Sequence, residues 1–197
     1  MKYLTILFSL AMLASCGSMP TRDSSTFRSV NLAVGQGEYD ESLDDEQPTV
    51  AGVQFLYQLS DDHEEKQSSG NVARGLVSDI SLNGSSVGIN DLGTTSIDLD
   101  IQTLDVRPGL RYYFDTGTPV FQPFIGAAVV GQYAHMETQV SGDDSDTFGL
   151  GGAARVGFES ALGEHTRLGV MYDHTWIEHD TDADLSGGAI LITLGWS

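Results

Sequence analysis

Alternating acids in Asp180-Thr181-Asp182-Ala183-Asp184 could bind Ca²⁺, which takes carboxylate oxygens at this spacing. A calcium loop of this kind also needs Gly at its sixth position and Glu at its twelfth. Counted from Asp180, this 197-residue chain has neither residue at those positions. We therefore expect a solvated acidic loop here and no metal site.

Two glycine-rich stretches, Gly35-Gln36-Gly37 and Gly149 to Gly152, have the residue type of a phosphate-binding loop. Such loops connect a strand to a helix, and neither stretch has that setting. Glycines within a strand instead let strands tilt and interior side chains fit. The sequence predicts no catalytic residue and no cofactor.

A third set of residues combines arginines with carboxylates in strand-like stretches. An arginine that faced lipid at mid-depth would cost about 2–4 kcal/mol, whereas inside a narrow lumen it can pair with a carboxylate. Because side chains fill an eight-stranded barrel, we expect a structural plug, with a narrow gated ion path as the functional alternative. This predicted lumen polar cluster comprises Asp105, Arg107, Arg111, Arg155, Glu159, Arg167 and Asp173.

The stretches that must position this set have an apolar residue at every second place, most clearly from about residue 97 to Trp196. Between Phe148 and Glu159, for example, one face is apolar and the other carries glycines, Arg155 and Glu159. A period of two with one apolar face suits a wall between lipid and a polar interior. No apolar run reaches 18 residues, so any crossing of a membrane must use strands.

We expect eight strands, an even number that lets an up-and-down sheet close with both termini on one side. The predicted fold is all-β, an eight-stranded antiparallel up-and-down transmembrane β-barrel. Two strands are irregular: 71–82 alternates poorly, and 96–114 changes phase, which a bulge near Gln102 or Thr103 would reconcile while turning Asp98 and Asp100 inward. The strands span 27–38, 49–60, 71–82, 96–114, 119–138, 147–162, 166–179 and 187–196.

Aromatic residues gather near the ends of these strands, where amphipathic rings favour the two interfaces of a bilayer. We expect two outward girdles from Phe27, Tyr39, Tyr57, Tyr112, Phe114, Phe121, Tyr133, Phe158, Trp176 and Trp196.

The first 15 residues are typical of an export signal, with Lys2 ahead of a short apolar stretch. Leu13-Ala14-Ser15-Cys16-Gly17 then resembles the lipobox of bacterial lipoproteins, which implies that Cys16 becomes the lipid-modified first residue. In such lipoproteins a residue other than Asp after the Cys, here Gly17, implies sorting to the outer membrane. We expect a signal peptide over 1–15, a tether over 16–26 and one barrel domain over 27–197.

The formal net charge is −19, from 28 acidic and 9 basic residues. Nucleic acid is therefore excluded as a partner, because phosphate binding needs a basic surface. Most acids lie between the apolar stretches and predict solvated loops. Their runs are Asp40 to Glu46, Asp61 to Glu65, Asp143 to Asp146 and Glu178 to Asp184.

Four stretches resemble the small outer-membrane β-barrels related to outer membrane protein A: Val106 to Phe114, Pro123 to Ala128, Gly149 to Phe158 and Leu191 to Trp196. The resemblance implies the outer membrane of a Gram-negative bacterium, contact with its lipids and loops that face the exterior. In that family the barrel assembly machinery reads a terminal aromatic residue, and here Ser197 follows Trp196. A lipobox in front of such a barrel is less usual, so either Cys16 is unmodified or this is a lipid-tethered variant.

His174 and His179 resemble, by position, the histidine of membrane-barrel lipid A deacylases. In that pattern a Ser stands two residues after the catalytic His, and here Trp176 does. Without a nucleophile nothing attacks an ester, so we expect no enzyme.

These observations predict a non-enzymatic outer-membrane barrel with a structural role, or an adhesive one mediated by its acidic loops, whose partner the sequence does not identify. The competing class is a soluble lipid-tethered barrel resembling the lipocalins, with a ligand in an apolar cavity. Such a barrel would turn its apolar face inward.

Overall fold

The computed structural model describes residues 27–39, 47–59, 75–89, 99–118, 120–138, 144–180 and 185–197. These residues form eight strands: β1 (Phe27–Tyr39), β2 (Thr49–Gln58), β3 (Gly75–Ile89), β4 (Leu99–Tyr113), β5 (Gln122–Thr138), β6 (Asp144–Ala161), β7 (Thr166–His179) and β8 (Gly187–Trp196). Within the described residues, no helix is long and apolar enough to span a bilayer.

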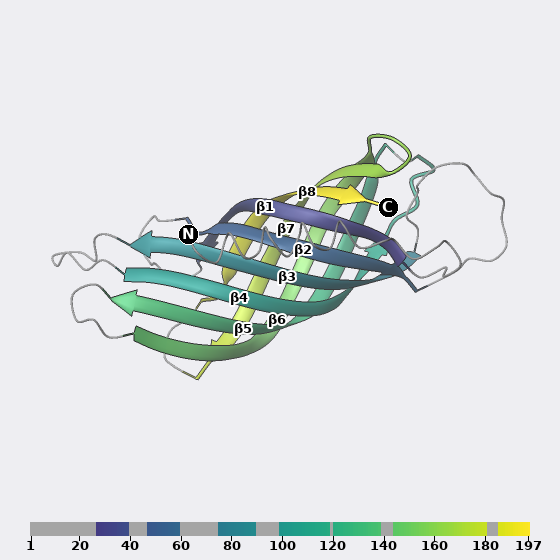
Figure 1. The fold of residues 1–197 in the computed structure, drawn as a ribbon. Coiled ribbons are helices and arrows are strands. Elements are labelled where there is room, and N and C mark those ends of the chain that lie inside the picture. Colours follow the sequence, from purple (N-terminus) through teal and green to yellow (C-terminus); the bar gives the residue numbers. More distant parts are fainter. Residues whose placement is uncertain are drawn as a thin grey trace.

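The strands close into one barrel in which each pairs with its neighbours in the chain and β1 pairs with β8 (Figure 1). Every pairing is antiparallel, and Val30 of β1 lies opposite Trp196 of β8. The predicted fold class is therefore confirmed. We call the end where β1 begins and β8 finishes the terminal end, and the opposite end the far end.

The wall of the barrel is uneven in height. β5 and β6 have 17 and 18 residues, whereas β2 and β8 have 10 each. The longer strands β3 to β6 project past β1, β2 and β8 at the far end (Figure 1). Within the described part of the chain, β6 pairs with β7 from Gly149 onward and Phe148 O accepts from Asp180 N at 3.3 Å, so Asp144–Asp146 extend past β7 and pair with β5.

Two predictions about individual strands are wrong. The third strand is Gly75–Ile89 rather than 71–82. The bulge near Gln102 is absent, because β4 keeps one register with β3 and with β5 through that position. As a result Ile101 is buried inside the barrel and Asp100 is exposed, the reverse of the expectation. Asp98 lies outside the described residues.

The outer face of the barrel is apolar. Val129, Leu150 and Ile190 are 63%, 61% and 61% exposed, and the alternate residues of their strands point inward. Exposed apolar side chains on this scale mark a surface that meets lipid or a partner rather than water. Tyr39 is an exception among the predicted girdle aromatics, since it packs against an interior cluster.

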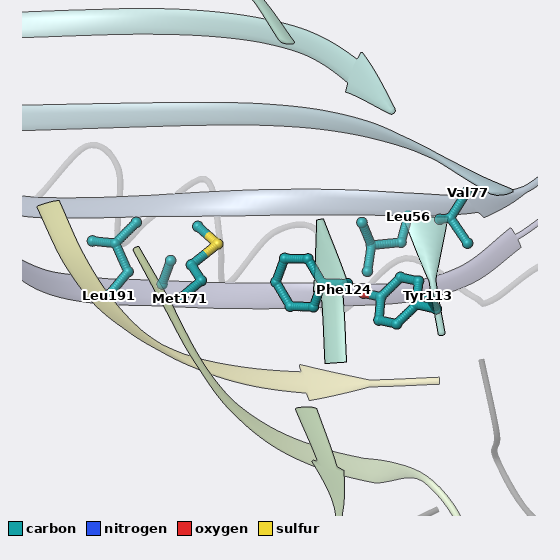
Figure 2. Close-up of a cluster of buried hydrophobic side chains, with 7 residues drawn as sticks. Leu56, Val77, Tyr113, Phe124, Met171 and Leu191 are labelled. Carbon is teal, nitrogen blue, oxygen red and sulfur yellow. The ribbon is translucent and has the colours of Figure 1, made fainter. Parts of the chain in front are cut away.

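Inside the barrel, an apolar column follows the lumen and comprises Ala33, Leu56, Val77, Tyr113, Phe124, Met171 and Leu191. Figure 2 shows six of these side chains in a row from Leu191 to Val77. Gly157 is needed beside this column, because a Cβ there would lie 2.7 Å from Met171 Cβ and 2.8 Å from Phe124 Cζ. At the far end, Val87, Ile101, Ala134 and Leu185 form a second apolar cluster.

Candidate functional site

The structure places all seven residues of the lumen polar cluster inside the barrel, each less than 9% exposed. They come from β4, β6 and β7, whose alternation turns the odd-numbered positions inward. Asp105, Arg107, Arg111, Arg155 and Asp173 lie in the middle of the lumen, whereas Glu159 and Arg167 lie toward the terminal end. Arg111 Nη1 lies 3.6 Å from Glu159 Oε1 and links the two sets.

Arg155 is the hub of the middle group. Its Nε donates to Asp173 Oδ2 at 2.7 Å, its Nη1 donates to Asp79 Oδ2 at 2.5 Å, and its Nη2 donates to Ser81 Oγ at 2.9 Å. One guanidinium therefore joins β6 to β7 and, across the lumen, to β3. Charge-assisted hydrogen bonds of this length are the strong ones in a protein interior.

Arg111 and Arg107 extend the network from β4. Arg111 Nε donates to Asp79 Oδ2 at 2.6 Å and its Nη2 to Gln54 Oε1 at 2.8 Å, while its guanidinium carbon lies 4.8 Å from the centre of the Phe124 ring. Arg107 donates to Asp173 at 3.0 Å and to Asp105 at 2.5 Å. We call Asp79, Asp105, Arg107, Arg111, Arg155 and Asp173 the mid-lumen network.

Glu159 is the carboxylate of the terminal end. Its Oε1 accepts from the Tyr113 hydroxyl at 2.8 Å and from Asn31 Nδ2 at 3.4 Å. Arg167 Nη1 lies 3.7 Å from Oε2, a looser contact than any in the mid-lumen network.

Sequence reasoning missed several members of this interior, above all Asp79, which bonds two of the arginines. Gln54, Ser81 and Tyr113 were missed with it. Asp79 lies in β3, whose predicted span and phase were weak. In the structure Val77, Asp79 and Ser81 occupy alternate positions of β3 and all three are buried, an alternation that the sequence of β3 marks only weakly.

A small cavity of about 50 Å³ lies between the mid-lumen network and the far end. Asp105, Arg107, Asp173, Thr175 and Leu191 contribute to its lining. A space of this size holds a few water molecules and is far smaller than the pockets that bind drug-sized ligands.

A separate polar group faces outward near the far end. Asp146 Oδ1 accepts from the Tyr133 hydroxyl at 2.7 Å and lies 2.7 Å from His135 Nδ1. Asp146 is exposed and lies beyond the apolar residues Phe148 and Leu150 of the same face, so it stands in water.

Titration of Asp146 should reveal these two contacts. The hydrogen bonds from Tyr133 and then His135 hold the pKa of Asp146 below its ordinary 3.8. A lowered carboxyl pKa stabilises the fold above the ordinary value, and this stabilisation is lost as the pH falls through the lowered pKa. We expect a carboxyl ¹³C midpoint below 3.8 in the wild type and a higher midpoint in Tyr133→Phe. An unchanged midpoint in Tyr133→Phe would rule out that contact.

The remaining sequence candidates form no catalytic group among the described residues. His174 lies on the outer face, where its Nδ1 is 3.3 Å from the Tyr172 hydroxyl and its ring packs edge-on against Trp176 at 4.4 Å. His179 points inward and its Nε2 lies 2.9 Å from Gln132 Oε1. Cys16 and residues 181–184 of the acidic loop lie outside the described residues.

Comparison with known proteins agrees with this architecture. A family model described as "Outer membrane protein beta-barrel domain" matches residues 8–197. Among curated proteins, no sequence matches the chain.

Several solved structures are similar to this chain in fold. Neisserial surface protein A is 16% identical, with 88% of this chain and 97% of that chain covered at a TM-score of 0.57. A second similar structure is that of Ail, the attachment invasion locus protein of Yersinia pestis, in complex with the heparin analogue sucrose octasulfate. Ail is 13% identical to this chain, and the match covers 87% of this chain and 96% of that chain at a TM-score of 0.54. The outer membrane enzyme PagL is 16% identical, and the match covers 84% of this chain and 97% of that chain at a TM-score of 0.50.

Proposed function

The chain belongs to the outer membrane protein beta-barrel family, and from that premise we propose a non-enzymatic barrel that acts through its outer surface and loops rather than through its lumen. It lies in the outer membrane of a Gram-negative bacterium. In this setting the terminal end is periplasmic and the far end faces the exterior. Outer-membrane lipids cover the apolar outer face, and the barrel assembly machinery inserts the chain.

The observation that supports this proposal is the network of buried ion pairs inside the barrel. The mid-lumen network crosses the lumen from β3 to β6 and β7, and its three arginines and three carboxylates are joined by five ion pairs. An ion path along these residues would have to break several buried ion pairs, each costly to open. The ion-channel alternative is therefore disfavoured.

The lipocalin-like alternative is wrong for this barrel. A soluble ligand-binding barrel presents polar side chains to water and keeps an apolar cavity inside. Here the interior holds buried Arg111 and Glu159, while Val129 and Leu150 lie exposed on the outside.

An enzymatic role has little support in the geometry. PagL shares the fold at low identity, which shows the fold alone. His174 has Tyr172 and Trp176 as ring neighbours on the outer face. The position two residues after His174, where a nucleophile would be needed, is occupied by Trp176 and not by Ser or Cys.

The charge of the exterior end indicates what kind of partner the loops take. Outward Glu38, Glu137 and Glu178 are exposed near the far ends of their strands, and the acidic runs of the adjoining connections add to them. Like charges repel and opposite charges steer association. We therefore propose a basic protein surface as the partner, unlike the heparin analogue bound by Ail.

Neutralising one acidic run at each end of the barrel tests this role. We expect that replacing Asp40, Glu41, Asp44 and Asp45 by their amides lowers the salt-sensitive binding of fluorescent polylysine to cells that display the barrel. The matched control replaces Asp61, Asp62, Glu64 and Glu65, which lie between β2 and β3 at the periplasmic end. Equal binding by both variants, or wild-type binding to heparin instead, would contradict the proposal.

A further inference from the structure

The charge balance of the lumen differs between its middle and its periplasmic end. Among the described residues, the buried interior holds five arginines and four carboxylates. The mid-lumen network has three of each, joined by hydrogen bonds of 2.5–3.0 Å. The other two arginines, Arg28 and Arg167, each lie 3.7 Å from Glu159, a carboxylate that Arg111 also approaches to 3.6 Å. The surplus positive charge therefore lies at the periplasmic end.

Arg28 reaches the lumen through an irregularity in β1. The register of β1 with β2 shifts between Phe27 and Ser29, and a bulge of this kind re-aims a side chain. As a result Arg28 and Ser29 are both buried, although neighbouring residues of a strand normally point to opposite faces. The Arg28 guanidinium carbon lies 4.2 Å from the centre of the inward Tyr113 ring.

The Arg28 guanidinium has no hydrogen-bond acceptor in the part of the chain that the structure describes. Its Nε, Nη1 and Nη2 are all buried, and its side chain is 7% exposed. Its nearest carboxylate oxygen, Glu159 Oε2, is 3.7 Å from Nη2, and the same oxygen is 3.7 Å from Arg167 Nη1. Charged donors that are buried without acceptors cost free energy.

We infer that Arg28 binds an oxyanion, a phosphate or a carboxylate, at the periplasmic end of the lumen. The guanidinium presents a planar fork of N–H donors that matches two oxygens of either group. One negative charge there would balance the five arginines against the four carboxylates. Tyr113 supports the site by holding its ring against Arg28 and by donating its hydroxyl to Glu159, which keeps that carboxylate in place.

Arginine Nε–Hε resonances of the full chain report on this site directly. The protein is folded in alkyl glucoside micelles, which contain no phosphate, and titrated with inorganic phosphate, acetate or chloride at equal ionic strength. We expect a saturable shift of the Arg28 resonance with phosphate or acetate and none with chloride. A saturable shift with only one of the two oxyanions would identify the chemical class of the ligand. A shift caused only by added phosphatidylglycerol would identify a lipid headgroup as the source of the oxyanion.

Substitution separates this site from a general effect of charge. Loss of a bidentate charge-assisted contact should lower oxyanion affinity about tenfold or more in Arg28→Gln, followed through the Arg167 resonance. Gly163→Asp is the control, because it makes the same change in net charge at the same end and its Cβ meets nothing within 4 Å. A heat-dependent gel shift verifies that each variant is folded. The inference is overturned if phosphate, acetate and phosphatidylglycerol all leave the Arg28 resonance without a saturable shift, or if Arg28→Gln binds as tightly as Gly163→Asp.

Discussion

Replacing Arg155 with methionine is expected to lower the free energy of unfolding by about 3–5 kcal/mol, because it leaves buried carboxylates without their shared partner. Asp79 would keep Arg111, and Asp173 would keep Arg107, but each would lose one of its two arginines. Urea unfolding in detergent micelles, followed by tryptophan fluorescence, measures the change.

A double-mutant cycle with Asp173→Asn tests whether the loss comes from the ion pair. If it does, Asp173→Asn costs less in the Arg155→Met background than in the wild type, because the two residues share a contact at 2.7 Å. Strictly additive effects, or a loss below about 1 kcal/mol for Arg155→Met, would show that the mid-lumen network does not hold the barrel together.

Val156→Arg should have the second large effect, a loss of about 2–4 kcal/mol, because it puts a guanidinium into hydrocarbon near mid-depth. Val156 is 52% exposed on the outer face of β6, where it lies opposite Ile125 of β5 and Tyr172 of β7. The same unfolding measurement in lipid bilayers gives the value.

Ser86→Arg is the matched control for depth. Ser86 is also exposed and outward, but it lies near the exterior end of β3, where the penalty for arginine falls to about 0–1 kcal/mol. Equal losses for the two variants would mean that the outer face does not sample the depth profile of a bilayer. The assignment of that face to lipid would then fail.

The sequence predicted the second half of this barrel well because one rule applied there at most positions. In β6, β7 and β8 most apolar residues face outward and most polar or small residues face inward, with Met171, Ile177 and Leu191 as apolar exceptions that face the lumen, so both faces could be assigned from alternation. The bounds of β7 and β8 matched the prediction. The inward direction of Arg155, Arg167 and Asp173 followed from the same alternation.

The rule failed where apolar side chains enter the lumen. Ile101 belongs to the interior cluster at the far end with Val87 and Leu185, so its apolar character did not mean contact with lipid. A shift of register was the natural explanation from sequence, and the register is in fact continuous. Asp79 was missed for a related reason, because β3 carries Ser78 and Gly84 on its outer face and so lacks the apolar period that would have revealed it.

The oblique outer rim of the barrel also bears on how neighbouring molecules meet. Beyond the level where β7 begins to pair, Asp144–Asp146 present a strand edge that has no strand beside it among the described residues. Open edges recruit strands from other chains, and charged side chains are a common defence against that pairing. Asp146 carries such a charge on this edge, so two copies that approach by it would bring like charges together. Negative charge at this edge thus opposes edge-to-edge strand pairing between two neighbouring barrels.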